Sequence, residues 1–110
     1  MWRRRPTPPS EPPAEHAVAL TPEARDELRR ATSWYAERSP TAAALFVEAY
    51  KLARSRISEL PTAWPELEPG IRRVSFRRFP YGLLYTIEPD HILVLAVMHQ
   101  KRQPGYWRGR

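Results

Sequence analysis

The side chains best suited to chemistry are cations and aromatic rings in the last third of the chain. The segment RRVSFRR carries four arginines, namely Arg72, Arg73, Arg77 and Arg78. A second group lies after a continuous apolar run and consists of His99, Lys101, Arg102, Tyr106 and Trp107. Guanidinium and ammonium groups bind phosphates and carboxylates, whereas aromatic rings stack on bases or insert into grooves of other proteins. Both groups therefore predict contact with an acidic or polyanionic partner.

The net charge of +6 is unevenly distributed along the chain. Residues 71–110 hold eight Lys or Arg against two acidic residues, whereas residues 21–60 hold seven basic and six acidic residues. A basic region on a nearly neutral scaffold favours a polyanionic or acidic partner. The alternative explanation is solubility, because charged side chains also serve simply as a solvated surface.

Candidates for acid–base or metal chemistry are few. His99 follows the apolar run and could serve as the general base of a nuclease, although a histidine in such a position is more often structural. The spacing of His16, His91 and His99 predicts no metal site, and the sequence contains no glycine-rich phosphate loop and no acyl-transfer triad. We therefore expect neither a metal nor a cofactor.

Composition and length also bear on the cellular compartment, on membrane insertion and on the number of domains. The absence of cysteine excludes disulfides and thiolate metal sites and suits a reducing compartment, so we expect a cytoplasmic protein. The longest apolar run is far shorter than the ~20 residues of a membrane helix, and no secretory signal is recognisable. A chain of 110 residues is expected to form one domain.

Three predicted strands must position these side chains. Residues 92–98 include no polar side chain, which is typical of a strand covered on both faces, and we expect this strand at the centre of the sheet. Residues 83–88 alternate as a half-buried strand does. In residues 71–78, Val74 and Phe76 point to one face, whereas Arg73, Ser75 and Arg77 point to the other. Turns at 80–82 and 89–90 connect the three strands into an antiparallel meander.

The same alternation separates the four arginines of the first strand. It places Arg72 and Arg78 on one face and Arg73 and Arg77 on the other, so they form a single patch only if a bulge intervenes. The alternative to a binding role is an edge strand whose charges prevent aggregation. For the rings of Tyr106 and Trp107, which follow the last strand, the alternative is that they cover the edge of the sheet.

Two helices are predicted before these strands, each with the same start signal. Thr21 and Ser39 are both N-cap residues, and each is followed by a proline, which is favoured at the first helical position. These signals predict a helix from residue 22 to about 38 and another from 40 to 60. Because only two or three residues separate them, the two helices are expected to form a hairpin.

The remaining segments complete the predicted fold. A short strand is expected at residues 17–20, and residues 61–70 are expected to be a loop. Residues 1–16 contain five prolines and almost nothing apolar, so we expect a disordered arm and assign it no function. The order β-α-α-β-β-β predicts an α+β domain over residues 17–107, in which the helical hairpin packs on a small, mostly antiparallel sheet. Residues 108–110 would form a basic tail.

Four segments in order carry a resemblance to a known family: LTPEARDEL, WYAERSPTAAALF, RRVSFRRFPYGLLYTIE and ILVLAVMHQKRQPGYW. In order and spacing they resemble toxins of the RelE/ParE superfamily of bacterial type II toxin-antitoxin systems. The combination of FPY with AVxHxxRxPxYW is closer to the ParE branch than to the RelE branch. The resemblance covers about residues 17–107.

The resemblance implies a small toxin that an antitoxin encoded beside it holds inactive in a hetero-oligomer. It implies one of two activities, since RelE-type toxins cut messenger RNA in the ribosomal A site, whereas ParE-type toxins poison DNA gyrase, inhibit growth and can stabilise plasmids. The antitoxin is expected to use the sheet and the exposed seam of the helical hairpin. A relic that still binds an antitoxin but no longer harms cells is a third alternative.

The resemblance also allows the two activities to be weighed by residue. RelE-type toxins cleave RNA with basic residues on the sheet and a C-terminal tyrosine, which Tyr106 matches. One of their arginines falls at Gly82 here, and a second falls near Gln100. Because losing a proton-transfer group costs ~10² to 10⁴ in rate, we favour gyrase inhibition without catalysis.

Two sets of residues follow as expectations. A nuclease would act through His99, Lys101, Arg102 and Tyr106, with Arg77 or Arg78. Residues expected to bind the target or the antitoxin are Arg72, Arg73, Arg77, Arg78, Tyr81, Lys101, Arg102, Tyr106 and Trp107.

Overall fold

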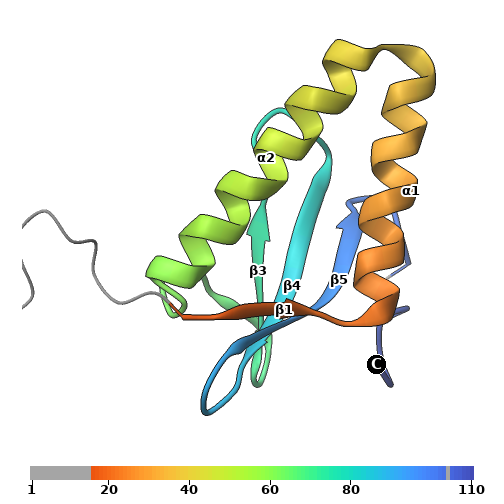
Figure 1. Ribbon diagram of the computed structural model, residues 1–110. Coiled ribbons are helices and arrows are strands. Elements are labelled where there is room, and N and C mark those ends of the chain that lie inside the picture. The colour runs from red at the N-terminus through yellow and green to blue at the C-terminus, as the bar shows by residue number, and fades with distance from the viewer. Residues whose placement is uncertain (1–15, 104) are drawn as a thin grey trace, which may run out of the picture.

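A computed structural model describes residues 16–103 and 105–110. Its elements are, in order, β1 (Val18–Leu20), α1 (Pro22–Arg38), α2 (Pro40–Glu59), β2 (Glu66–Glu68), β3 (Ile71–Ser75), β4 (Tyr81–Ile87) and β5 (Ile92–His99). The two helices form a hairpin that lies along one face of a five-stranded sheet (Figure 1). The predicted α+β class and the helical hairpin are thus confirmed.

Both predicted helix starts are confirmed by their caps. The Thr21 hydroxyl accepts a hydrogen bond from the backbone N–H of Ala24 at 3.0 Å, and the Ser39 hydroxyl accepts one from Ala42 at 3.2 Å. Ser39 also donates its own N–H to the carbonyl of Tyr35 at 2.8 Å, so it ends α1 as well as beginning α2. Because Ser39 both ends α1 and caps the start of α2, the connection between the two helices is very short.

The sheet has the strand order β1-β5-β4-β3-β2, in which β1 is parallel to β5 and all other neighbours are antiparallel. The expected meander of β3, β4 and β5 is present, but β4 is the central strand instead of β5. The reason is that β1 extends the sheet beyond β5, while β2 extends it beyond β3. Strand β2 forms within residues 61–70, which we expected to be a loop, and it pairs with Arg72 and Ile71.

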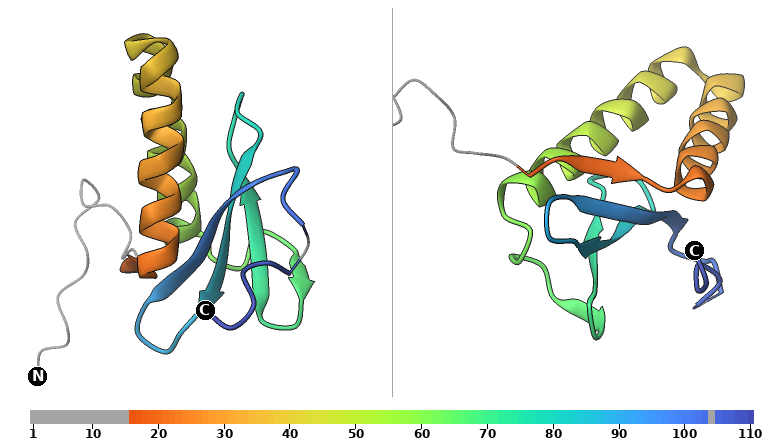
Figure 2. Two further views of the ribbon diagram at one scale, coloured as in Figure 1. Left: turned by 90° about the vertical axis from the view of Figure 1, so that its right-hand side faces the viewer. Right: turned by 60° about the horizontal axis from the view of Figure 1, so that its bottom comes forward.

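Strand β4 is buried on both faces, although its alternating pattern predicted one exposed face. Leu83 and Tyr85 pack against the helices in the main core, where Phe46 and Ile57 of α2 are fully buried. Leu84, on the opposite face of β4, is fully buried in a second core together with Leu95, Met98 and Trp107. The residues after β5 fold back over this face and supply its cover (Figure 2). We call residues 100–110 the C-terminal segment.

The turn between β3 and β4 lies earlier than predicted. Strand β3 ends at Ser75, and Tyr81 and Gly82, which we expected in the turn, already belong to β4. Residues 76–80 form the connection, which we call the hairpin tip. Since Arg77 and Arg78 lie in this tip, the strand alternation that we used to assign them to opposite faces does not apply.

The predicted arm lies outside the described residues except for its last residue, His16. Its backbone N–H donates to the carbonyl of Ser58 at 3.1 Å, and the Ser58 hydroxyl donates to the carbonyl of His16 at 2.6 Å. These bonds hold His16 against the end of α2, so the packed domain includes this residue.

Candidate functional site

An open groove of about 770 Å³ lies between α1 and the C-terminal segment. It brings together four of the residues singled out in the sequence, namely Tyr81, His99, Arg102 and Tyr106. Helix α1 supplies the other wall with Glu23, Asp26, Glu27, Arg30, Trp34 and Tyr35. The groove therefore carries both signs of charge together with several aromatic rings, which makes it a candidate for binding a protein segment of mixed character.

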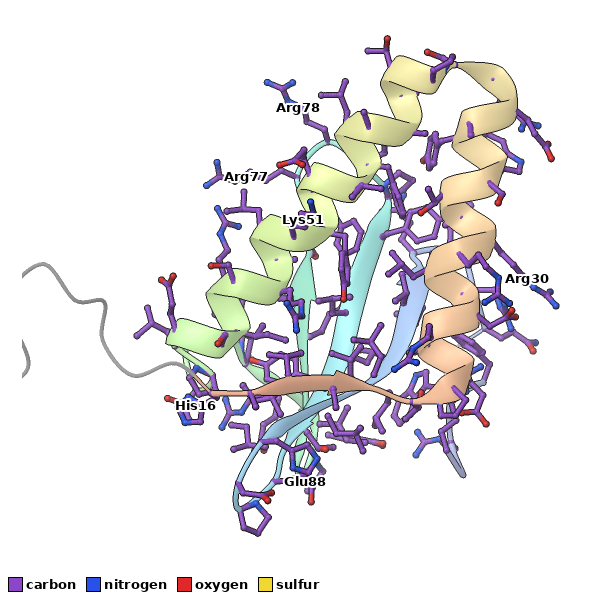
Figure 3. The ribbon with its side chains drawn as sticks, in the orientation of Figure 1. His16, Arg30, Lys51, Arg77, Arg78 and Glu88 are labelled. Atoms are coloured by element: carbon purple, nitrogen blue, oxygen red, sulfur yellow. The ribbon has the colours of Figure 1, made fainter. Side chains whose placement is uncertain are left out.

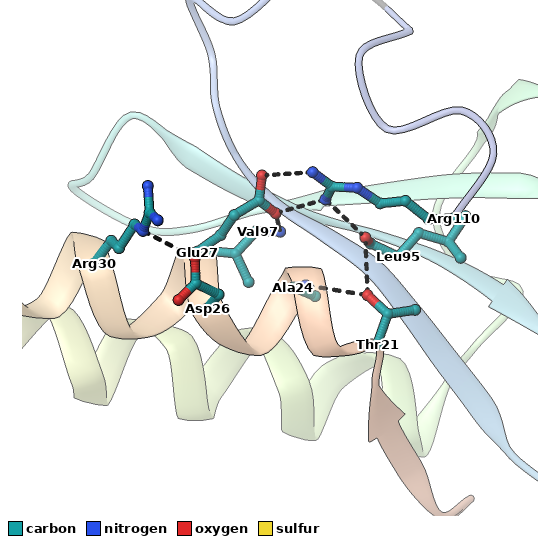
Figure 4. A network of polar contacts seen from close by, with 8 residues as sticks. All are labelled: Thr21, Ala24, Asp26, Glu27, Arg30, Leu95, Val97 and Arg110. Atoms are coloured by element: carbon teal, nitrogen blue, oxygen red, sulfur yellow. Dashed lines mark hydrogen bonds and ion pairs between the residues drawn. The ribbon is translucent and has the colours of Figure 1, made fainter.

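The lining of the groove includes an ion pair between Glu27 of α1 and Arg110 (Figure 4). The Arg110 guanidinium donates to both oxygens of Glu27, at 2.9 and 3.3 Å, and both side chains are 16% exposed. Arg110 also donates to the Leu95 carbonyl at 3.2 Å, and Glu27 accepts from the Val97 N–H at 3.0 Å. We call the Glu27–Arg110 pair the latch.

The latch has a structural cause in the sheet. Strand β1 pairs with β5 only as far as Val94, so the next residues of β5 have backbone groups with no neighbouring strand on that side. Glu27 accepts from the Val97 N–H, and Arg110 donates to the Leu95 carbonyl, which also accepts from the Thr21 hydroxyl at 3.3 Å. Nothing in the sequence pairs Glu27 with a residue 83 positions away.

Tyr106 lines the groove, and two guanidinium groups lie near its ring. Arg102 is 3.8 Å from the centre of its ring and Arg110 is 5.0 Å from it. Its hydroxyl oxygen is buried and has no hydrogen-bond partner among the described residues. Burial, and after it the nearby Glu27 carboxylate, raise the pKa of Tyr106 far above its ordinary value. This phenol therefore holds its proton more firmly than an ordinary tyrosine does, which disfavours a role as general base.

His99 and Tyr81 pack on each other at the inner end of the groove. Their rings meet edge to face with centroids 5.0 Å apart, and burial raises the pKa of Tyr81. The Nδ1 atom of His99 accepts a hydrogen bond from the backbone N–H of Lys101 at 3.0 Å. This bond leaves only Nε2 of a neutral His99 to interact with another molecule.

The side chains of Arg72 and Arg73 lie against other parts of the fold. Arg72 donates to the Trp64 carbonyl at 2.6 Å and lies 3.5 Å from a carboxylate oxygen of Glu66, so it fixes the segment that leads into β2. Arg73 lies over Gly82, where a Cβ atom would be only 2.9 Å from the Arg73 Nε. That Nε atom is buried without a hydrogen-bond partner among the described residues. The absence of a side chain at Gly82 makes room for Arg73.

The remaining predicted residues divide between the core and the surface. Trp107 is 6% exposed and packs in the second core, so its ring covers the face of the sheet and is not available to a partner. Arg77, Arg78 and Lys101 are exposed, and within residues 16–103 and 105–110 none of them forms an ion pair. The nine predicted residues thus form no single site.

The described part of the chain contains no group of three or more His, Asp or Glu side chains that could hold a metal ion. Neither helix in that part is long and apolar enough to cross a membrane.

Comparison with known proteins adds evidence independent of this geometry. The family model described as the ParE toxin of the type II toxin-antitoxin system parDE matches residues 18–104. A chain from the solved structure of the chromosomal ParDE TA system from P. aeruginosa is similar with a TM-score of 0.67 and 17% sequence identity. The alignment covers 76% of this chain and 95% of that one, and at such low identity the likeness concerns the fold alone. No curated protein matches the chain.

Proposed function

The chain belongs to the ParE toxin family of type II toxin-antitoxin systems, and we propose that it inhibits DNA gyrase without cutting RNA and is neutralised by a cognate antitoxin. Gyrase acts on DNA in the bacterial cytoplasm, so the proposal places the toxin there and makes plasmid stabilisation a natural role. The competing activity within the superfamily is ribosome-dependent cleavage of messenger RNA, which requires catalytic side chains that move protons.

The observation that carries the proposal is the state of Tyr106. Among the residues required for cleavage, it is the one that matches the RelE-type pattern in the sequence, yet Arg102 and Arg110 lie near its ring and its hydroxyl is buried. Its raised pKa disfavours loss of the phenol proton to a reaction partner. At the position of one missing arginine, Gly82 is covered by the side chain of Arg73. These contacts suit a packing residue better than a catalytic one.

The helical hairpin is the best candidate for the antitoxin surface. Trp34 on α1 and Leu45 on α2 are each 49% exposed, and Leu52, two turns after Leu45, is 41% exposed. Residues seven apart lie on the same face of a helix, so Leu45 and Leu52 form one apolar stripe. An amphipathic antitoxin helix covering this stripe and the adjoining groove would bury on the order of 1,500 Å², as stable complexes do.

A supercoiling assay with purified gyrase tests the proposal. We expect the toxin to block supercoiling of relaxed plasmid, the Tyr106→Phe variant to block it equally well, and prior mixing with the antitoxin to abolish the effect. Supercoiling that continues unchanged in an excess of free toxin would refute the target. Toe-printing on translated messages supplies the opposite test, because a nuclease would produce A-site cuts that disappear in Tyr106→Phe.

A further inference from the structure

The hairpin tip, residues 76–80, presents two arginines that the fold itself does not use. Arg77 and Arg78 are exposed, and neither forms an ion pair or a side-chain hydrogen bond with another described residue. The sequence has no acidic residue between Glu68 and Glu88, so the hairpin itself supplies no carboxylate to neutralise them. Two full positive charges are thus available to another molecule.

The backbone of the tip is fixed by its own aromatic residues. Phe76 is 6% exposed and its ring centroid lies 5.5 Å from that of Phe46, while Phe79 lies 5.3 Å from the same ring. The Phe76 N–H donates to the Tyr81 carbonyl at 2.8 Å, and the Pro80 carbonyl accepts from the N–H of Gln100 at 2.8 Å. The alternation Phe-Arg-Arg-Phe therefore anchors both ends of the tip in the core and leaves the two arginines between them.

Arg78 adopts an unusual backbone conformation for a residue with a side chain. Its φ angle is +70°, and it is the one non-glycine residue with positive φ among those described. The left-handed region is unfavourable for such a residue, so the surrounding contacts must hold it there. Figure 3 shows both guanidinium groups pointing away from the domain, on the side of α2 opposite to α1. In Figure 2 the hairpin tip projects beyond the ends of the other strands.

The chemistry of the tip favours a phosphate backbone over a protein surface. Tight protein interfaces are anchored by buried aromatic or aliphatic side chains, but both Phe rings of the tip turn into the core. A nucleic-acid backbone needs only correctly placed cations, and the planar guanidinium group can donate two parallel hydrogen bonds to one phosphate. No exposed ring at the tip is available to stack on an unpaired base, which favours double-stranded over single-stranded nucleic acid.

We propose that Arg77 and Arg78 of the hairpin tip form a sequence-independent contact with the phosphate backbone of double-stranded DNA. The contact itself does not depend on the target of the toxin. Its use does rest on the proposed function, because gyrase holds duplex DNA while it acts. A toxin bound to gyrase could then touch that DNA with the tip while the exposed apolar stripe of the helical hairpin remains the site for the antitoxin.

The test is fluorescence anisotropy of the full chain with a labelled 20-base-pair duplex, titrated at several salt concentrations. Arg77→Gln combined with Arg78→Gly removes both charges, and glycine accepts positive φ without strain. The control, Arg29→Gln with Arg108→Gln, removes two exposed arginines that already bind Asp26 and Glu68. Both double variants lower the net charge by the same amount, so a difference in their DNA affinity reflects where on the protein the removed charges lie.

We expect the tip variant to lose affinity roughly 10- to 100-fold at 0.1 M salt, because each phosphate contact contributes about 0.9 to the slope of log K against log salt. Its slope should be shallower by about 2, and the control should change by less than about threefold. Circular dichroism and thermal unfolding check that the variants are folded. Equal affinity of tip variant and wild type, or equal losses in both double variants, would overturn the proposal.

Parallel assays keep this proposal distinct from gyrase inhibition. Loss of antitoxin binding in the tip variant with DNA affinity intact would overturn the proposal and assign the tip to the antitoxin. Wild-type DNA binding by the tip variant, with gyrase still inhibited, would overturn the DNA contact alone. Tip-dependent DNA binding by a toxin that leaves gyrase unaffected would support the contact and refute the proposed target.

Discussion

The C-terminal segment and the hairpin tip are both rich in arginine, but the fold uses their side chains differently. In the C-terminal segment Arg108 binds Glu68, Arg110 binds Glu27, and Arg102 lies against the ring of Tyr106. At the hairpin tip, Arg77 and Arg78 have no such partner among the described residues. Regional net charge, which joins both regions into one basic surface, therefore does not locate a binding site. A binding site is located instead by asking which cations have no partner within the fold.

The largest effect that distinguishes the two regions should come from Trp107. Its indole is buried in the second core, so Trp107→Ala should lower the free energy of unfolding by about 3–5 kcal/mol. Trp34→Ala is the matched control, because Trp34 is 49% exposed and its loss should cost less than about 1 kcal/mol. Urea unfolding measures both. Similar small losses in the two variants would mean that the C-terminal segment is not part of the folded core.

Breaking the latch should have the next largest effect. Glu27→Gln removes one charge of a pair in which each side chain is 16% exposed, and it should lower the free energy of unfolding by about 1–3 kcal/mol. Asp26→Asn, whose partners Arg29 and Arg30 are exposed, should cost less than about 1 kcal/mol. The same urea titrations apply. A loss no greater for Glu27 than for Asp26 would contradict the structural role of the latch.

Tyr106→Phe should change stability little at neutral pH, by about 0.5 kcal/mol or less, because the lost hydroxyl has no hydrogen-bond partner. Alkaline pH should separate the two proteins. Burial and the Glu27 carboxylate raise the pKa of Tyr106, so the folded protein holds this proton more tightly than the unfolded chain does. Wild-type stability is then complete below the ordinary tyrosine pKa of about 10 and falls as pH rises above it.

The Tyr106→Phe variant should show a shallower fall above that pH. Part of the fall remains, because burial also raises the pKa of four other tyrosines, namely Tyr35, Tyr50, Tyr81 and Tyr85. Urea unfolding at a series of pH values gives both curves. Parallel alkaline slopes in the variant and the wild type would show that the Tyr106 phenol is not buried as described.

The smallest effect on stability should come from the hairpin tip. Arg77→Gln with Arg78→Gly removes no internal contact and relieves the positive φ of Arg78, so the free energy of unfolding should change by less than about 1 kcal/mol. Thermal unfolding checks this. A large destabilisation would mean that the tip arginines, like those of the C-terminal segment, serve the fold.

Local signals in the sequence predicted most of the fold. The caps at Thr21 and Ser39 determine the helix starts through contacts within a few residues, which is why sequence reasoning located them correctly. The alternating pattern around Leu83 and Leu84 led to the wrong prediction of one exposed strand face. Leu84 is buried because Trp107, more than twenty residues later, covers it. A pattern in one strand reports which side chains are apolar, and it does not report what will cover them.

The candidate site was harder to predict than the fold, because its contacts also join residues that are far apart in the sequence. The sequence placed Tyr106 and Arg102 in one group, and they are neighbours in the structure. It could not show that Glu27 would bind Arg110, which comes much later in the chain. It assigned Arg77 and Arg78 to strand faces, whereas the chain leaves the strand at Ser75 to bury Phe76 and Phe79. Which arginines are free is decided by these long-range contacts.

The measurement that tests the account most directly is induced expression of the toxin in bacterial cells with pulse labelling of DNA and protein synthesis. We predict that DNA synthesis stops first while protein synthesis continues, that Tyr106→Phe has the same effect, and that co-expressed antitoxin prevents it. An early stop of protein synthesis that Tyr106→Phe abolishes would contradict the account and identify a ribosome-dependent nuclease. Continued growth with both syntheses intact would contradict it as well, and would indicate a relic that only binds its antitoxin.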